Sequence, residues 1–254
     1  MDSSVIDKPT RKLTQIDLRN QRISIYKKHV LGGIPSVFLR IDGKQLKPAL
    51  MTNRDKNFKL FVSKFFYNGK DGSTDVWSDN FGLPTGLKLT STAYKAFFRY
   101  AKTDYGSAVV KEMVSNLEKY KGFSVRQATG TRPTAKADYL VILLPSNFPS
   151  ITRFPTGGQR IFDLAIIHHE FAHTMLVRSK KSKTLTIKDE LWAVRKAENP
   201  IRLKRGGGRY EPRYVYYNGN STVNVITGEI LPLQWTVSKY DPRIMVKLNH
   251  KDAL

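Results

Sequence analysis

Hydrophobic and polar residues alternate in short runs along the first third of the chain. The runs lie at Arg22–Tyr26, Ser36–Ile41 and Phe58–Val62, and the turn pairs Asp42-Gly43 and Asn68-Gly69 come after the second and third runs. Alternation with a period of two is typical of half-buried strands, and Asp-Gly and Asn-Gly pairs favour tight turns. We therefore predict that the first third of the chain is mainly β.

Apolar residues then recur at helical spacing in two segments. Tyr94, Phe97, Phe98 and Ala101 fall at i, i+3, i+4 and i+7, which predicts a helix over 91–102 whose aromatic face belongs to the core. The second segment has a serine before its apolar stripe and a glycine after it. Its residues are Ser107, Val110, Met113, Val114, Leu117 and Gly122. We predict a helix that Ser107 caps and Gly122 ends.

The middle of the chain combines two apolar strands with a buried helix. Phe123–Gln127 and Tyr139–Leu144 have the length of strands, and the second is apolar throughout, as in a strand buried on both faces. Prolines and glycines over 145–158 predict a long irregular loop. The segment Phe162–Val177 is apolar on all sides of a helical projection, which predicts a buried helix.

A further helix and a hairpin are predicted near the C-terminus. Thr186 can cap a helix that runs to Asn199, where we expect Pro200 to end it. Tyr214–Ile226 contains two apolar runs around Asn218-Gly219, which is typical of a hairpin. Short strands interspersed with helices predict an α+β fold.

Length and composition fit one soluble globular domain. The chain has 254 residues, of which 40% are hydrophobic and 25% charged, and we expect a single domain over 21–254 after a flexible, basic N-terminal arm over 1–20. The N-terminus lacks the apolar run of a secretory signal, and no stretch approaches transmembrane length. If the protein is exported, we expect it to leave by another route or as part of a larger chain.

Two histidines and a glutamate in the buried helix have the spacing of a metal site. His169-Glu170-Phe171-Ala172-His173 reads H-E-x-x-H, so both imidazoles share one helix face and can bind one metal ion. Glu170 lies about 100° around the helix, where a general base can reach a metal-bound water. The motif predicts Zn²⁺ bound by His169 and His173 with Glu170 as the catalytic base. His168 points away from this face and is expected to pack behind it.

Three carboxylates on the predicted helix after Thr186 compete as the third metal ligand. They are Asp189, Glu190 and Glu198. Glu190 shares a small apolar face with Ala193 and Ala197, which would let two helices approach closely, whereas Glu198 is better placed to pair with Arg202. We predict Glu190 as the ligand and keep Glu198 as the alternative. The chain has no cysteine, so thiolate ligands are excluded.

Residues 169–202 carry a pattern that is shared with a known family. The matching elements are His169-Glu170-x-x-His173, Glu190-x-x-Ala193-Val194, Glu198-Asn199-x-x-Arg202 and Arg213-x-x-Tyr216. This pattern resembles the NleD-type metallopeptidases that bacterial secretion systems deliver, and the metallopeptidase domains at the C-terminal end of type VI secretion spike proteins (VgrG). The metzincin subclass is excluded, because Leu176 and Ser179 stand where its glycine and third histidine would be.

The resemblance implies a zincin-like effector or toxin that cleaves a protein or an envelope peptide. It implies secretion without a classical signal peptide and action in a target cell, in the host cytoplasm or the bacterial periplasm. Partners would include a peptide substrate and a secretion-system spike, chaperone or immunity protein. The oxyanion of peptide hydrolysis needs a donor besides zinc, and Tyr216 is the candidate, with Tyr214 and Tyr217 as alternatives.

The charge of the chain supports a different function. The net charge of +22 predicts attraction to nucleic acid, an anionic membrane or an acidic wall polymer. Interleaved tyrosines and arginines over 209–217 could stack on bases and bind phosphates. The alternative is therefore a basic binding module for nucleic acid or envelope polymer with a non-catalytic metal. Against it, a structural zinc is usually closed by four ligands, commonly including cysteine.

Overall fold

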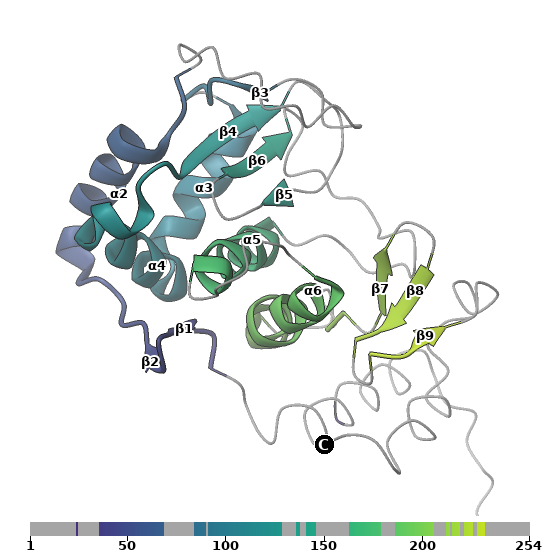
Figure 1. Cartoon of the computed structure of the whole chain (residues 1–254). Coiled ribbons are helices and arrows are strands. Elements are labelled where there is room, and N and C mark those ends of the chain that lie inside the picture. Colours follow the sequence, from purple (N-terminus) through teal and green to yellow (C-terminus); the bar gives the residue numbers. More distant parts are fainter. Residues whose placement is uncertain are drawn as a thin grey trace, which may run out of the picture.

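The computed structural model has helices packed around a small mixed sheet, as the α+β prediction expects (Figure 1). It describes residue 24 and residues 36–68, 84–89, 91–128, 136–137, 141–145, 163–178, 186–205, 212–213, 215–218, 221–225 and 228–231. The predicted arm over 1–20, the run at Arg22–Tyr26 except Ser24, Tyr214 and most of the loop over 145–158 lie outside these residues. Within them, no helix is both long and apolar enough to cross a membrane.

The central sheet has the strand order β3-β4-β6-β5. Its long strands, β4 (Ser124–Ala128) and β6 (Val141–Pro145), pair in parallel, which confirms both strands predicted in the middle of the chain. The short strands β3 (Pro84–Thr85) and β5 (Lys136–Ala137) pair antiparallel at the two edges. Ile142, Leu143 and Leu144 are at most 1% exposed, as expected for a strand covered on both faces.

Among the described residues of the first third, 24, 36–68 and 84–85, helix predominates over strand, so the prediction that this third is mainly β is wrong for this part of the chain. Residues Met51–Phe65 form the helix α2, which buries Arg54, Phe58, Phe61 and Phe65. These residues recur at intervals of three and four, which is a helical period. The run Phe58–Val62, which was predicted to be a strand because it alternates, contains the exposed Leu60. Within residues 36–68, β1 (Arg40–Ile41) and β2 (Lys44–Gln45) form a hairpin around the predicted turn at Asp42 and Gly43, both with positive φ.

The helices α3 (Thr92–Lys102) and α4 (Asp104–Ser115) are separated by Thr103 alone. The first confirms the helix predicted over 91–102, with Ser91 as its N-cap, although Phe98 is 38% exposed and the buried Tyr100 takes its place in the core. Ser107 does not cap the second helix. Thr103 caps it by accepting a hydrogen bond from the Gly106 N–H, so the helix begins four residues earlier than predicted.

The second helix also ends earlier than predicted. It ends at Ser115 and is followed by the 3₁₀ turn η1 (Leu117–Tyr120), and Gly122 then has a φ of 82°. Ser107 is buried inside α4, where its hydroxyl donates to the Asp104 carbonyl and accepts from the Ala49 N–H. The serine thus joins α4 to the segment before α2.

Gly106 is required where α3 and α4 meet. A Cβ at this position would overlap the carbonyl oxygen of Tyr100 and lie 2.7 Å from its carbonyl carbon, both backbone atoms that cannot rotate away. We expect Gly106→Ala to destabilise the fold by about 2–3 kcal/mol, as overpacked sites do. Thermal unfolding is the measurement, at about 2–4 °C per kcal/mol for a chain of this size. Ser115→Ala, an exposed change on the same helix, is the control and should not lower the melting temperature.

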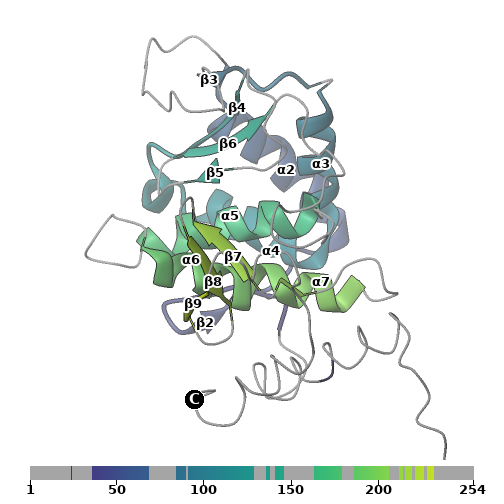
Figure 2. The same cartoon turned by 90° about the vertical axis from the view of Figure 1, so that its right-hand side faces the viewer.

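The buried helix α5 (Asp163–Arg178) lies between the sheet and a second helical layer (Figure 2). Phe171 at its centre packs on an aromatic cluster from α2, α3 and the start of the sheet: Phe61, Phe97, Tyr100 and Phe123. These contacts fix the rotation of α5. The face of the helix with Phe171 is turned to the core, and the face with His169 and His173 is turned to the second layer.

The second layer is one bent helical segment in three parts. These are α6 (Ile187–Ala193), the π-helical turn η2 (Val194–Glu198) and α7 (Asn199–Arg205). Pro200 does not end the helix, which corrects the prediction. The Asn199 N–H bonds to the Val194 carbonyl, five residues back, so the helix is widened where the proline ring would otherwise meet the preceding turn.

The predicted C-terminal hairpin is present and packs on this second layer. The strands β7 (Val215–Asn218) and β8 (Ser221–Asn224) pair antiparallel, and β9 (Ile230–Leu231) joins the far edge of β8. A small apolar cluster of Leu191, Val194, Val223 and Val225 attaches the hairpin to α6 and η2. Tyr216 packs against this cluster, which places β7 beside the helix face that carries Glu190.

Candidate metal centre

The H-E-x-x-H residues lie in the middle of α5 and are almost fully buried. His169, Glu170 and His173 are 4%, 7% and 1% exposed, and their ligand atoms lie within 4.8 Å of one another, so this group could hold a metal ion. The two imidazoles face each other one helical turn apart, with 2.9 Å between their Nε2 atoms. Both Nε2 atoms therefore point to the same place, as the spacing predicts.

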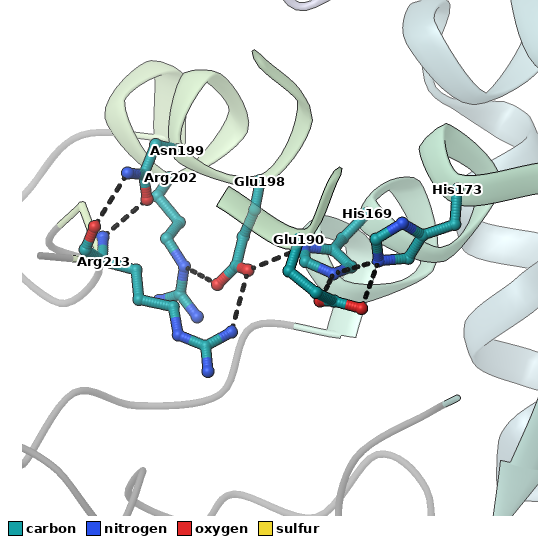
Figure 3. A network of polar contacts seen from close by, with 7 residues as sticks. All are labelled: His169, His173, Glu190, Glu198, Asn199, Arg202 and Arg213. Carbon is teal, nitrogen blue, oxygen red and sulfur yellow. Dashed lines mark hydrogen bonds and ion pairs between the residues drawn. The ribbon is translucent and has the colours of Figure 1, made fainter. Parts of the chain in front are cut away.

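Glu190 brings its carboxylate to the same place from α6 (Figure 3). Its Oε2 lies 3.4 Å from Nε2 of His169, and its Oε1 lies 3.2 Å from Nε2 of His173. Donor atoms about 2.0–2.1 Å from a tetrahedral zinc are about 3.3 Å apart. The observed distances of 2.9 to 3.4 Å fit that arrangement.

Glu190 and His169 each shift the pKa of the other. Burial lowers the pKa of His169, but the carboxylates of Glu190 and Glu198 outweigh it and raise that pKa to about 10. Burial in turn raises the pKa of Glu190, but its contacts with His169 and His173 bring that pKa well below its usual range. The carboxylate is therefore charged at neutral pH and available to a cation.

Glu170 and Glu190 are both close enough to be considered as the third ligand. Glu190 comes from a separate helix and its two oxygens each face one imidazole. Glu170 follows His169 on the same helix, and its pKa is raised, chiefly by burial. A carboxylate with a raised pKa is suited to accept and return a proton near neutral pH. The geometry and the pKa shifts thus favour Glu190 as ligand and Glu170 as base.

Glu198 lies on the other side of the His169 ring, within a buried ionic network. Its Oε1 accepts a hydrogen bond from Arg202 Nε at 2.8 Å, and its Oε2 accepts one from Arg213 Nη1 at 3.3 Å. The predicted pairing with Arg202 is thereby confirmed. The same Oε2 is 3.2 Å from Nδ1 of His169. Burial raises the pKa of Glu198, but the two arginines outweigh burial and hold that pKa well below its usual range.

The network continues from η2 into the segment before β7. The side chain of Asn199 donates to the Arg213 carbonyl at 2.9 Å and accepts from the Arg213 N–H at 2.5 Å. The guanidinium of Arg213 lies over the Tyr216 ring, 4.8 Å from its centroid. Two consecutive residues of the second layer, Glu198 and Asn199, therefore fix both the side chain and the backbone of Arg213.

Tyr216 approaches the site from the hairpin. Its pKa is raised above the usual range, first by burial and then by the negative charge of Glu190. The phenol is therefore protonated at neutral pH and can donate its proton in a hydrogen bond. Of the two alternatives, Tyr214 lies outside the described residues, and Tyr217 lies in β7 directly after Tyr216.

His168 packs behind the motif, as predicted. Its Nδ1 is 2.8 Å from the Tyr100 hydroxyl, its ring meets the edge of Tyr105, and the side chain is fully buried. Burial lowers its pKa to about 3, so the imidazole is neutral. Asp189 is also away from the site, because its carboxylate accepts hydrogen bonds from the N–H and the hydroxyl of Thr186 at the start of α6.

Two features of the site were missed at the level of sequence. These are the contact of Glu198 with His169 and the clamp of Asn199 on Arg213. In a regular α-helix, Glu198 would be rotated about 80° from Glu190, since eight residues exceed two turns by that angle. The π turn η2 reduces the rotation per residue, so both carboxylates face His169. The pattern Glu198-Asn199-x-x-Arg202 was the available signal.

Comparison of the chain with family models, curated proteins and solved structures gives no significant match. The functional assignment therefore rests on the geometry of the site.

Proposed function

We propose that the protein is a zinc-dependent metallopeptidase. The observation that carries the proposal is the convergence of three donor groups, from His169, His173 and Glu190, with a buried carboxylate, Glu170, beside them. Two histidines and a glutamate from separate helices form the usual protein ligand set of a catalytic zinc in one large class of peptidases. The zincin-like character of the fold belongs to this proposal.

Zinc at this site would polarise a peptide carbonyl and bring the pKa of a bound water toward neutrality. Glu170, with its raised pKa, would accept a proton from the attacking water and pass it to the leaving amine. Tyr216 would donate a hydrogen bond to the oxygen on which negative charge develops, because its own proton is firmly held. Arg213 holds the Tyr216 ring in place for that role.

The exposure of the site favours catalysis over a purely structural metal. The Glu190 side chain is 23% exposed, whereas both histidine side chains are nearly buried, so the site reaches solvent at the glutamate. A structural zinc is closed by four protein ligands, and a catalytic zinc keeps one position for water or substrate. The resemblance of residues 169–202 to secreted effector metallopeptidases adds the proposal that the substrate is a polypeptide of a target cell.

Purified protein is expected to retain about one zinc per chain after mild dialysis, because the described residues offer one set of paired histidines at metal-binding spacing. Elemental analysis measures the metal, and mass spectrometry of a complex peptide mixture detects hydrolysis that a chelator abolishes and zinc restores. His169→Ala is the matched variant. An absence of zinc, with wild type and His169→Ala equally active, would refute the proposal.

A further inference from the structure

Glu198 forms an ion pair with Arg202 within its own helical segment, and it also contacts two residues outside that segment. It is fully buried and its two oxygens contact three different groups, Arg202, Arg213 and His169. A buried ion pair often contributes little net stability, because desolvation offsets the attraction between the charges. The contact with His169 suggests that the carboxylate has a role at the metal site.

The two nitrogens of His169 face different carboxylates. Nε2 faces Glu190 and His173, so this atom must be free of a proton to bind a metal. Nδ1 then carries the proton of the neutral ring, and it lies 3.2 Å from Oε2 of Glu198. The distance is that of a hydrogen bond, but the contact as it stands does not meet the full geometry of one.

The arginines explain why Glu198 can be held so close to the imidazole. Arg202 Nε and Arg213 Nη1 fix one oxygen each, so the carboxylate cannot rotate freely. Two guanidinium groups also keep the carboxylate charged in a buried place. A charged, immobile acceptor beside Nδ1 favours the Nδ1–H tautomer and raises the basicity of Nε2.

We propose that Glu198 is a positioning residue of the metal site, which holds His169 in the Nδ1–H tautomer with Nε2 directed at the metal. Arg202 and Arg213 orient Glu198 for this purpose, and the π turn η2 brings it to the ring. The inference rests on the proposed zinc site and adds a group that acts through His169 without binding the metal itself.

The tautomer of His169 can be measured in the unaltered protein. In zinc-loaded protein with ¹⁵N-labelled histidine, two-bond ¹⁵N–¹H correlation spectra distinguish the two ring nitrogens, and the signals absent from His169→Gln assign the residue. We expect His169 to bind zinc through Nε2 and to show a slowly exchanging proton on Nδ1, protected by Glu198. Coordination through Nδ1, or a rapidly exchanging Nδ1 proton, would overturn the inference.

A pair of variants separates positioning from stability. Glu198→Gln keeps the shape but removes the charge, and we expect zinc affinity, measured by chelator competition, to fall about 10–100-fold. Asp189→Asn removes the charge of another buried carboxylate in the same helical segment, and it should lower the melting temperature with zinc affinity unchanged. Wild-type affinity in Glu198→Gln would overturn the inference.

Two further outcomes have defined meanings. If Glu198→Gln does not fold, Glu198→Asp keeps the charge for the arginines but shortens the reach to His169, and it should show the same loss of affinity. A wild-type affinity in that variant would likewise overturn the inference. If the wild-type protein binds no zinc, the proposed function itself fails. If it binds zinc and substitution of Glu198 leaves the affinity unchanged, only the inference about Glu198 fails.

Discussion

Glu170→Gln is expected to lose peptide hydrolysis almost completely while retaining zinc. The substitution preserves the volume of a side chain that is only 7% exposed, but an amide cannot accept and return a proton. General acid–base catalysis of this kind contributes about 10²–10⁴-fold to a rate, so kcat should fall by that factor. The measurement is the rate of cleavage of peptides first identified with the wild-type protein, together with zinc content.

The pH profile of the wild-type protein provides an independent check on Glu170. Because burial raises its pKa above the ordinary value, kcat/KM should fall on the acid side at a pH above that of an ordinary glutamate. Tyr216→Phe is the matched control, since it removes a donor and leaves the base in place. It should lower kcat without moving the acid limb. Full activity in Glu170→Gln would exclude the residue as the base.

The sequence was informative where one local feature determines the structure. Spacing within a single helix placed His169 and His173 together, and the pattern around Glu190 predicted the side of the next helix that meets them. Both predictions depend only on regular helix geometry. The strands over 123–127 and 139–144 were likewise predicted, because a short apolar run between turn residues has few alternatives.

The sequence was misleading where tertiary contacts override local preference. Phe58, Leu60 and Val62 alternate in the sequence, but the aromatic core selected Phe58, Phe61 and Phe65, which recur at helical spacing. Pro200 stands inside a helical segment because η2 widens the helix before it. The contact of Glu198 with His169 depends on that same π turn, so it could not be derived from a regular helical projection.

Glu190→Ala is expected to lose zinc while the fold is retained. Each oxygen of the Glu190 carboxylate faces Nε2 of one of the two histidines. Because the side chain is partly exposed, its truncation leaves no large buried cavity. Zinc affinity should fall by more than the roughly 100-fold that loss of an outer partner costs. Chelator competition measures the affinity, and circular dichroism checks the fold. Affinity that survives Glu190→Ala but not Glu198→Ala would exchange the roles of the two glutamates.

The same variant should change how stability depends on pH. In the metal-free protein the pKa of His169 is raised to about 10 by Glu190 and Glu198. The raised pKa stabilises the folded protein. This stabilisation is complete below about pH 6.5, the pKa of histidine in the unfolded chain, and is lost as the pH rises toward 10. Zinc has the opposite dependence, because it must displace the His169 proton, so its affinity should rise about tenfold per pH unit over this range.

Chelator-treated wild-type protein should therefore become less stable between pH 6.5 and 10, whereas zinc-loaded protein should gain stability relative to it. Glu190→Ala removes the first of the two carboxylates that raise the pKa of His169, so both dependences should extend over a narrower pH range in that variant. Thermal unfolding at a series of pH values, with and without zinc, measures each dependence. Parallel curves for the metal-free and zinc-loaded wild-type protein would mean that zinc does not compete with the His169 proton and is bound elsewhere.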